Sequence, residues 1–463
     1  MTTEEQLHVP GRMPGGVAEL LSIALPMVVS SACETIMMFV DRLFLSKLGP
    51  EYMGAAMGGG LTVFMFMTFF IGLTGYANAL VAQHYGAHQK DRCAVVMSQA
   101  LIIAVLAYPA ILLCMPMGEL LFRVMNAPEE QLPLQRLYFR ILMWGTLMPL
   151  LRNSLSSFFS GIGRTRVVML SAAVSMLVNV AGNYVLIFGH LGFPALGMRG
   201  AAIGTLMGSG AGLIVLAAAY TARRYRREYR IVRGLRFEWE SMQKLLHFGT
   251  PSGLEFFLNL LAFDLLVLNF HSYGVTEAAA MSIMFSWEMF SFIPLIGVGI
   301  GVTSLVGRYM GAGSPDTAHR AMTSGLKLAC TYSMFTFAAF LLLAGPMVAV
   351  FKPMDAGEEF RDVIPLAVFM LRMVSVYVFA DAVAIVFSSA LRGAGDTFWT
   401  MVISVAGHWC FTIGAAVLVR VFNVDPRLTW STVVVLVMGL CVAFVIRYRG
   451  GAWRKLVVVG SGD

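Results

Sequence analysis

The amino-acid sequence predicts an all-α polytopic membrane protein, with twelve transmembrane helices in two six-helix bundles related by a pseudo-two-fold axis along the membrane normal. Three observations lead to this fold class. The 463 residues are 58% hydrophobic and only 13% charged, with a mean hydropathy of +0.75. Long apolar stretches recur along the chain, and its two halves repeat the same motifs. Because a soluble domain carries roughly a quarter charged residues, a bilayer is the solvent that suits this composition.

Apolar stretches long enough to span a bilayer, which takes about 20 residues, occur twelve times. They cover residues 17–45, 53–82, 94–117, 134–159, 167–189, 200–220, 245–271, 277–306, 322–351, 363–391, 398–421 and 429–447. The runs are continuous rather than alternating, so we expect helices and not the strands of a barrel. Kinks are expected at the prolines inside the spans, which are Pro26, Pro109, Pro149, Pro251, Pro294 and Pro365.

The distribution of basic residues predicts the orientation. With twelve spans, both termini and the even-numbered loops share one side, and that side holds most of the 33 Lys and Arg. The opposite loops are poorer in Lys and Arg and carry Glu129, Glu130, Glu358 and Glu359. We therefore expect both termini and the central connection to be cytoplasmic. That connection contains Arg223, Arg224, Arg226, Arg227, Arg230, Arg233, Arg236 and Lys244.

An internal repeat defines the predicted domains. Pro26 and Gly49 of the first half match Pro251 and Gly274 of the second, and VAQHYGA after the second helix matches VGRYMGA after the eighth. The expected domains are an N-terminal bundle (1–220), a basic cytoplasmic linker (221–244), a C-terminal bundle (245–447) and a cytoplasmic tail (448–463). Six helices per half give the two halves parallel topology, which is typical of transporters with a substrate cavity between two bundles.

Ionisable side chains inside the predicted spans are the candidates for function, because a charge at the bilayer centre costs several kcal/mol. The acids are Glu34, Asp41, Glu255, Asp264, Glu288 and Asp381, and the bases include Arg152 and Arg372. Glu34 and Asp41 are seven residues apart, which returns a helix to nearly the same face about 10 Å further along. Both carboxylates can therefore line one wall of a cavity.

The ordered motifs of both halves resemble those of multidrug and toxic compound extrusion (MATE) transporters over essentially the whole chain. The matching segments are FVDRLFLSKLG, GLTGYANALVAQHYGA, NVAGNYVLIFG, LGMRGAAIGT, SLVGRYMGAG and DAVAIVFSSALRGAGDT, together with Pro26. The resemblance is nearest to the bacterial sodium-driven drug-exporter branch. It implies a V-shaped pair of bundles and cation-coupled export of organic compounds.

The resemblance also implies an ion site in the N-terminal half. Asp41 stands at the family's acid in the first helix, and Asn179 and Asn183 share one face of the fifth helix. With Thr205 of the sixth helix, they are expected to hold the coupling ion, Na⁺ or H⁺, and all four could ligate Na⁺. Asn183 replaces the Asp of one branch, so fewer charges hold sodium and proton coupling through Asp41 stays open. The structural alternatives are an interfacial pair with Arg42 and amide hydrogen bonds between helices.

The C-terminal half departs from the family pattern. Asp381 matches the family's acid in the tenth helix, so the resemblance implies that it also holds the coupling ion or a substrate cation. Tyr377 lies one turn before it. The drug-exporter branch carries an acid eight residues after the proline of the seventh helix, where this sequence has Asn259. We expect Glu255, one turn earlier, or Glu288 of the eighth helix to substitute. The candidates for the substrate or a second ion are therefore Glu34, Glu255, Asn259, Glu288 and Tyr377.

These features predict a Na⁺- or H⁺-coupled antiporter that exports small, amphipathic organic cations by alternating access. The alternatives are a flippase for lipid-linked precursors and a membrane-embedded enzyme. We expect no cofactor, no enzymatic activity and no nucleic-acid partner, since the sequence lacks a Walker A motif, a nucleophile elbow and zinc-finger spacing. The predicted setting is a monomer in the bacterial inner membrane, in contact with lipid.

Overall fold

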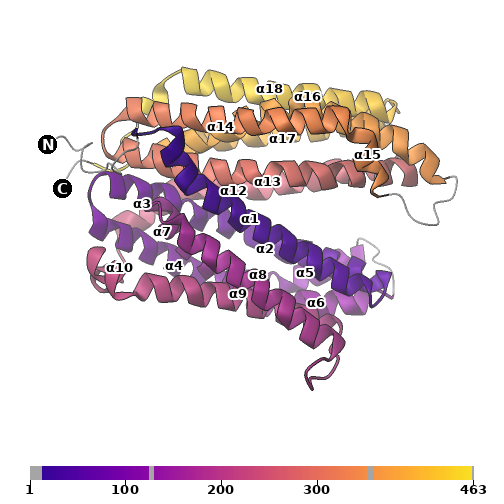
Figure 1. The fold of residues 1–463 in the computed structure, drawn as a ribbon, viewed down its shortest axis with the longest axis horizontal. Coiled ribbons are helices and arrows are strands. Elements are labelled where there is room, and N and C mark those ends of the chain that lie inside the picture. The colour runs from indigo at the N-terminus through magenta and orange to yellow at the C-terminus, as the bar shows by residue number, and fades with distance from the viewer. Residues whose placement is uncertain (1–12, 125–129, 352–358, 461–463) are drawn as a thin grey trace. The chain divides into compact units, whose positions relative to one another are not determined.

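The computed structural model describes residues 13–124, 130–351 and 359–460, and helices form nearly all of this part of the chain (Figure 1). The predicted all-α fold is confirmed. Eleven helices in the described segments are long and apolar enough to cross a membrane. Glu129 and Glu358, which contributed to the predicted orientation, lie outside the described residues.

The first half of the chain contains nine helices in the described residues, and the connection to the second half contains two short ones. The nine are α1 (Val17–Ser46), α2 (Pro50–Gly75), α3 (Ala77–Gly86), α4 (Lys90–Leu113), α5 (Met115–Val124), α6 (Leu132–Gly145), α7 (Leu147–Gly161), α8 (Thr165–Phe188) and α9 (Met198–Thr221). The two in the connection are α10 (Arg223–Glu228) and α11 (Ile231–Gly234).

The second half contains seven α-helices in the part that the structure describes, followed by a short 3-10 helix at Ala452–Lys455. The seven are α12 (Trp239–His271), α13 (Val275–Gly311), α14 (Pro315–Leu342), α15 (Ala344–Ala349), α16 (Glu359–Ala394), α17 (Thr397–Arg420) and α18 (Pro426–Arg449). Their order reproduces the predicted spans, with ends shifted by a few residues.

The fourth predicted span, residues 134–159, is present as two shorter helices, α6 and α7, which meet at Thr146. Pro149 explains the break, because it has no N–H to donate to the carbonyl of Gly145 four residues earlier. The hydroxyl of Thr146 instead donates to the Met143 carbonyl (2.8 Å). Counted with this broken helix, the structure accounts for the twelve spans.

A second break separates α2 from α3 at Tyr76. The amide of Asn153, on α7, donates to the carbonyl of Ile71 (3.0 Å) and to the hydroxyl of Thr74 (3.1 Å). Ser157, one turn further along α7, donates to the carbonyl of Gly75 (3.4 Å). Because lipid offers no hydrogen bonds, irregular backbone at membrane depth needs such protein partners.

The chain forms two compact units. The first unit comprises Met1–Ala24, Glu255–Val306 and Ser314–Val457, and the second comprises Leu25–Leu254, Gly307–Gly313 and Val458–Asp463. Helices α1, α12 and α13 therefore contribute residues to both. The domain boundaries expected from the sequence, after residues 220, 244 and 447, were placed from the predicted membrane spans. They remain a prediction.

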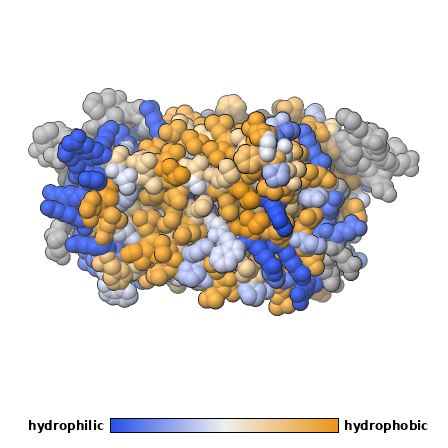
Figure 2. Space-filling view, turned by 90° about the horizontal axis from the view of Figure 1, so that it is seen from below, coloured by the Kyte–Doolittle hydropathy of each residue, from blue (hydrophilic) through white to orange (hydrophobic). Residues whose placement is uncertain are grey.

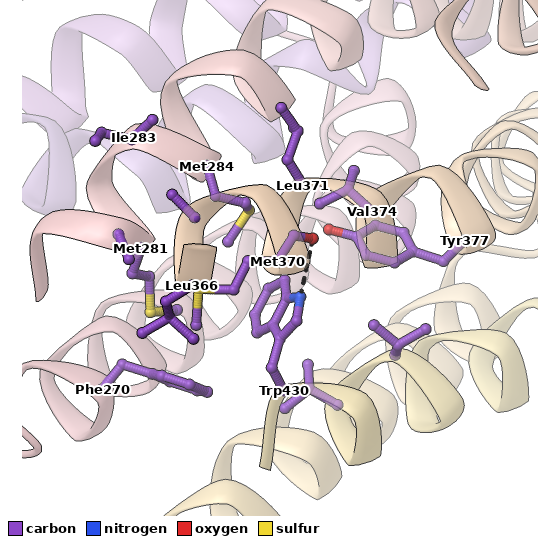
Figure 3. Close-up of a cluster of buried hydrophobic side chains, with 14 of the residues drawn as sticks. Phe270, Met281, Ile283, Met284, Leu366, Met370, Leu371, Val374, Tyr377 and Trp430 are labelled. Atoms are coloured by element: carbon purple, nitrogen blue, oxygen red, sulfur yellow. Dashed lines mark hydrogen bonds between the residues drawn. The ribbon is translucent and has the colours of Figure 1, made fainter. Parts of the chain in front are cut away.

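Each unit has its own hydrophobic core. In the first unit, Trp430 is 2% exposed and packs edge-on against Phe270, and its indole donates to the Met370 carbonyl (3.4 Å) (Figure 3). In the second unit, the fully buried Phe139 contacts Phe122 and Phe66 edge-on. These rings fix the helices that carry the polar groups described below.

The outer surface of the spans is apolar. Leu113, Ile214 and Phe335 are 82%, 69% and 72% exposed. Hydrophobic side chains cover most of the middle of the face in Figure 2, and hydrophilic ones concentrate toward its two ends. Such apolar area would be a liability in water, so it fits a protein surrounded by lipid.

Candidate functional site

The N-terminal polar group consists of Asp41, Asn179 and Asn183, and all three lie in the second unit. The side-chain amide of Asn183 donates to Asp41 Oδ1 (2.5 Å) and to Asn179 Oδ1 (3.4 Å). Both asparagines are fully buried. The structure thus brings together three of the four residues that the sequence predicts for the ion site of the N-terminal half.

Glycines on α9 set the position of the two asparagines. Gly204 and Gly208 face α8, and a Cβ atom on Gly208 would lie 2.7 Å from the Cβ of Asn179. A Cβ on Gly204 would overlap the side chain of Asn183. With Gly200 and Gly212, they form a stripe of small residues at every fourth position, which lets two membrane helices approach closely. A larger residue at Gly204 or Gly208 would displace the asparagines.

Thr205, the fourth predicted residue, donates its hydroxyl to the Ala201 carbonyl of its own helix (3.0 Å). Tyr138 of α6 links it to the group, because Tyr138 interacts both with Thr205 and with the charge of Asp41. Tyr138 is 7% exposed and belongs to the hydrophobic core of the second unit. Thr205 therefore lies beside the polar group rather than directly on Asp41.

The oxygen atoms of the N-terminal polar group suit a monovalent cation or a proton. Asp41 supplies the one titratable carboxylate, and Asn183 Oδ1 is buried with no hydrogen-bond partner among the described residues. Carboxylate and amide carbonyl oxygens are the ligands that hard cations prefer. No group of three or more His, Cys, Asp or Glu that could hold a metal occurs in the described segments.

The C-terminal polar group consists of Glu288, Tyr377 and Asp381, in the first unit. The hydroxyl of Tyr377 on α16 donates to Glu288 Oε1 on α13 (2.5 Å). Asp381 lies one turn after Tyr377, and its carboxylate interacts electrostatically with Glu288. Glu288 Oε2 is buried and has no hydrogen-bond partner in the described residues. Of the two proposed substitutes for the missing acid of the seventh helix, Glu288 is the one beside Asp381.

Glu255 belongs to a different set of contacts. It is 4% exposed, and its Oε2 lies 3.9 Å from Nη1 of Arg392, at the end of α16. Asn259, one turn further along α12, donates its amide to the Ser404 hydroxyl (2.8 Å), and His408 Nδ1 contacts the Ser404 carbonyl (2.7 Å). The negative charge of Glu255 therefore has a cationic neighbour, whereas Glu288 has an acid and a phenol.

Glu34, on α1, forms an ion pair inside the membrane spans. Its Oε1 accepts a hydrogen bond from Nη2 of Arg152 on α7 (2.8 Å). The sequence identified both residues but did not pair them, because residues 118 positions apart give no local spacing to read. Tyr138 and the glycine stripe were also missed; the four-residue spacing of Gly200, Gly204, Gly208 and Gly212 was the signal that could have found the stripe.

Comparisons with known proteins identify the family of the chain. A family model described as MatE matches residues 26–185 and 251–418. Multidrug resistance protein PmpM of Pseudomonas aeruginosa is 27% identical over 460 residues, covering 96% of this chain and 93% of that protein. Probable multidrug resistance protein NorM of Thermotoga maritima is 23% identical over 448 residues, covering 95% and 94%.

Solved structures share the fold. A crystal structure of MATE in complex with MaL6 superposes with a TM-score of 0.86 at 22% identity, covering 97% of this chain and 100% of that one. An outward-facing conformation of a multidrug resistance MATE family transporter gives a TM-score of 0.86 at 21% identity, covering 95% and 97%. At these identities the likeness establishes the fold alone.

Proposed function

The chain belongs to the MatE family, and on this premise we propose that it is a cation-coupled antiporter that exports small amphipathic organic cations by alternating access. The family matches both halves of the chain, and its members are secondary transporters, so the expectation that the protein is not an enzyme is confirmed. The coupling ion, the class of substrate and the site residues are the parts that we propose.

The contact of Asp41 with Asn183 carries this proposal. One partly buried carboxylate among neutral amides can hold a single proton or a single Na⁺, and it loses that ion if a cationic substrate neutralises the charge instead. Ionisable residues in membrane spans mark ion and substrate paths for this reason. Asp41, Asn179 and Asn183, with Thr205 and Tyr138 beside them, are the proposed coupling site.

We propose that Glu288 and Asp381 form a second cation site in the C-terminal half. Two carboxylates close together repel one another, so a proton or a cation between them is favoured. The phenol of Tyr377 holds Glu288 in place and offers an aromatic face to an organic cation. Exchange of the coupling ion for the substrate at these carboxylates gives antiport.

The proposed setting is the bacterial inner membrane. The chain is a multi-pass membrane protein with small-molecule substrates, and we propose that both termini and residues 221–244 face the cytoplasm, as the basic residues predict. We also propose that the protein is a monomer in contact with lipid.

Reconstituted vesicles test this function. A fluorescent organic cation is brought to equal concentration inside and outside proteoliposomes, and a sodium gradient and a pH gradient are then imposed separately. The proposal expects transport of the dye against its gradient with at least one of the two, and none in vesicles without protein. If neither ion gradient drives net movement of the dye, and the dye moves only down its own concentration gradient, coupling is contradicted.

A further inference from the structure

The connection between the two halves of the chain is a folded element that packs on the second unit. Tyr229 and Ile231 are 3% and 2% exposed, and the ring of Tyr229 meets that of Phe158 on α7 edge-on. A Cβ atom on Gly234 would lie 2.5 Å from the Cβ of Ala94, so α11 lies directly against α4. The connection therefore presents a fixed set of side chains to its surroundings.

Two side chains of α4 hold the backbone of this connection. Ser98 Oγ donates to the Gly234 carbonyl (2.6 Å), and Gln99 Nε2 donates to the Arg236 carbonyl (2.8 Å). Gln99 Oε1 in turn accepts a hydrogen bond from the backbone N–H of Glu238 (3.3 Å). Because these contacts use backbone atoms of the connection, they leave its arginine side chains available.

Most of these arginines carry a charge that no carboxylate balances. Residues 223–236 contain seven arginines and one acid, Glu228, and all seven arginines are exposed. Arg230 and Arg236 form ion pairs with carboxylates, at 2.8 Å and 3.0 Å. Among the described residues, the other five form no ion pair; they are Arg223, Arg224, Arg226, Arg227 and Arg233.

Three of the unpaired arginines line an open surface pocket of about 720 Å³. Its lining consists of Arg223, Arg224, Arg227 and Glu228. The carboxylate of Glu228 is already paired with Lys90 (2.8 Å), so the pocket has a net positive charge. A guanidinium offers parallel N–H donors that match the oxygens of a phosphate. The pocket therefore suits a group that carries a phosphate.

Exposed apolar side chains follow directly along the chain and are interleaved with arginines. Val232, Leu235, Phe237 and Trp239 are 64%, 58%, 60% and 58% exposed. A binding surface for a small soluble anion has no use for them. Arginines together with exposed Leu, Phe and Trp are instead typical of segments that lie in the interface of a bilayer. This composition favours a lipid headgroup as the source of the phosphate.

We propose that residues 223–239 form a binding surface for anionic phospholipids. The arginines of α10 contact the headgroup phosphates, and the exposed apolar side chains of residues 232–239 enter the boundary of the acyl chains. Each basic side chain near the membrane surface adds to the attraction for anionic lipid, so the unpaired charges select anionic over zwitterionic headgroups. The surface is separate from both polar groups of the spans, and it fixes the connection between the halves to the membrane.

Competition between two lipids tests this inference. The purified full-length protein in detergent is mixed with equal amounts of phosphatidylglycerol and phosphatidylcholine that have the same acyl chains, and the lipids that stay bound are counted by native mass spectrometry. The unaltered protein should retain phosphatidylglycerol about tenfold more than phosphatidylcholine, which one or two basic side chains can supply.

Removal of three unpaired charges should remove most of this preference. In the variant Arg223→Gln/Arg226→Gln/Arg227→Gln, the ratio of the two bound lipids should fall about fivefold or more. These side chains are exposed and form no ion pair with the described residues, so the fold should be unaffected, which circular dichroism checks. Leu235→Ser/Phe237→Ser should instead weaken the binding of both lipids.

The matched control removes three exposed arginines on other helices, Arg123, Arg199 and Arg420. Their replacement by Gln lowers the net charge by the same amount and should leave the ratio of bound lipids unchanged. An equal fall in the control, or an unchanged ratio in the folded α10 variant, would overturn the inference.

Inorganic phosphate separates a lipid surface from a site for a small anion. At constant ionic strength, millimolar phosphate in place of chloride should leave the bound phosphatidylglycerol unchanged. Its displacement by phosphate would show that the pocket takes a soluble anion and would overturn the inference. Neither result bears on the proposed export function, which involves other residues.

Discussion

The carboxylate of Asp41 in the N-terminal half has two amides as neighbours, whereas Asp381 in the C-terminal half has a second acid and a phenol. Asn183 donates to Asp41 at 2.5 Å, and Tyr377 donates to Glu288 at 2.5 Å. The first group carries at most one negative charge and the second at most two. The two halves of the chain therefore carry polar groups of different chemistry.

This difference suggests a division of roles between the halves. A single carboxylate with neutral oxygen ligands suits the binding and release of one small ion. Two acids that interact titrate as a pair, and an aromatic ring beside them suits a larger organic cation. Removal of the sole charge of the first group should thus have the larger effect on export.

The largest expected effect is that of Asp41→Asn. The substitution keeps the shape of the side chain and the contact with Asn183 but removes the only charge that binds the ion. Gradient-driven export in proteoliposomes should fall on the order of 100-fold, which corresponds to about 2.7 kcal/mol. Asp362→Asn, at an exposed position of α16, is the control and should export normally. Full export by a well-folded Asp41→Asn protein would remove this residue from coupling.

Substitutions of Glu288 and Asp381 in the C-terminal half should affect export in a coupled, non-additive way. Glu288→Gln and Asp381→Asn should each lower export roughly tenfold, and the double variant should be little worse than either, since interacting residues are not additive. Additive losses would show that the two acids act independently. If Glu255→Gln is instead the change that is non-additive with Asp381→Asn, the seventh helix supplies the partner and Glu288 is dispensable.

A substitution can make the N-terminal half resemble the C-terminal half. Asn183→Asp places a second carboxylate beside Asp41, and an added negative charge at this range attracts a cation more strongly. The sodium concentration for half-maximal export should fall roughly tenfold. An unchanged or higher sodium requirement would indicate that Asn183 does not face the ion.

The smallest effect is expected outside both groups, at Glu238. This carboxylate accepts hydrogen bonds from Arg92 (2.6 Å), Arg236 (3.0 Å) and Ser241 (2.6 Å). Burial acts to raise its pKa, but the Ser241 hydrogen bond and the charges of Arg92 and Arg236 outweigh it and hold the pKa below its usual range. Glu238→Gln should lower the free energy of unfolding by about 1 kcal/mol and leave the ion dependence of export unchanged.

The pH dependence of this loss has a defined sign. A carboxylate with a lowered pKa in the folded state stabilises the protein above its unfolded pKa, near 4.3 for Glu. That stabilisation disappears as the pH falls through the folded pKa. Thermal unfolding in detergent should therefore separate Glu238→Gln from the unaltered protein at neutral pH, and the two curves should converge in acid. A constant difference at all pH values would contradict the assignment.

Much of the fold could be predicted from the sequence because the hydrophobic requirement of a span is local and cumulative. Each stretch of about 20 apolar residues is visible by itself, and Pro149 marks the break between α6 and α7. The break at Tyr76 was not predicted, because its stabilising side chain, Asn153, lies 77 positions further along the chain.

The contacts of the candidate site also fall into those that the sequence could predict and those that it could not. Asn179 and Asn183 could be grouped by their spacing on one helix, and their contact with Asp41 follows the family motif. The pairing of Glu34 with Arg152 and the choice of Glu288 over Glu255 depend on how separate helices pack. No spacing along the chain carries that information, so it required the structure.

The exchange of ion for substrate at Asp41 is tested most directly by measuring ion release on binding. An organic cation is added to the purified protein in weakly buffered solution, once without sodium, where released protons are followed with an indicator dye, and once with sodium at fixed pH. The account predicts that substrate binding releases protons or weakens as sodium rises, and that Asp41→Asn reduces this effect while Asp362→Asn preserves it. Binding that releases no proton and has the same affinity at every pH and sodium concentration would contradict it.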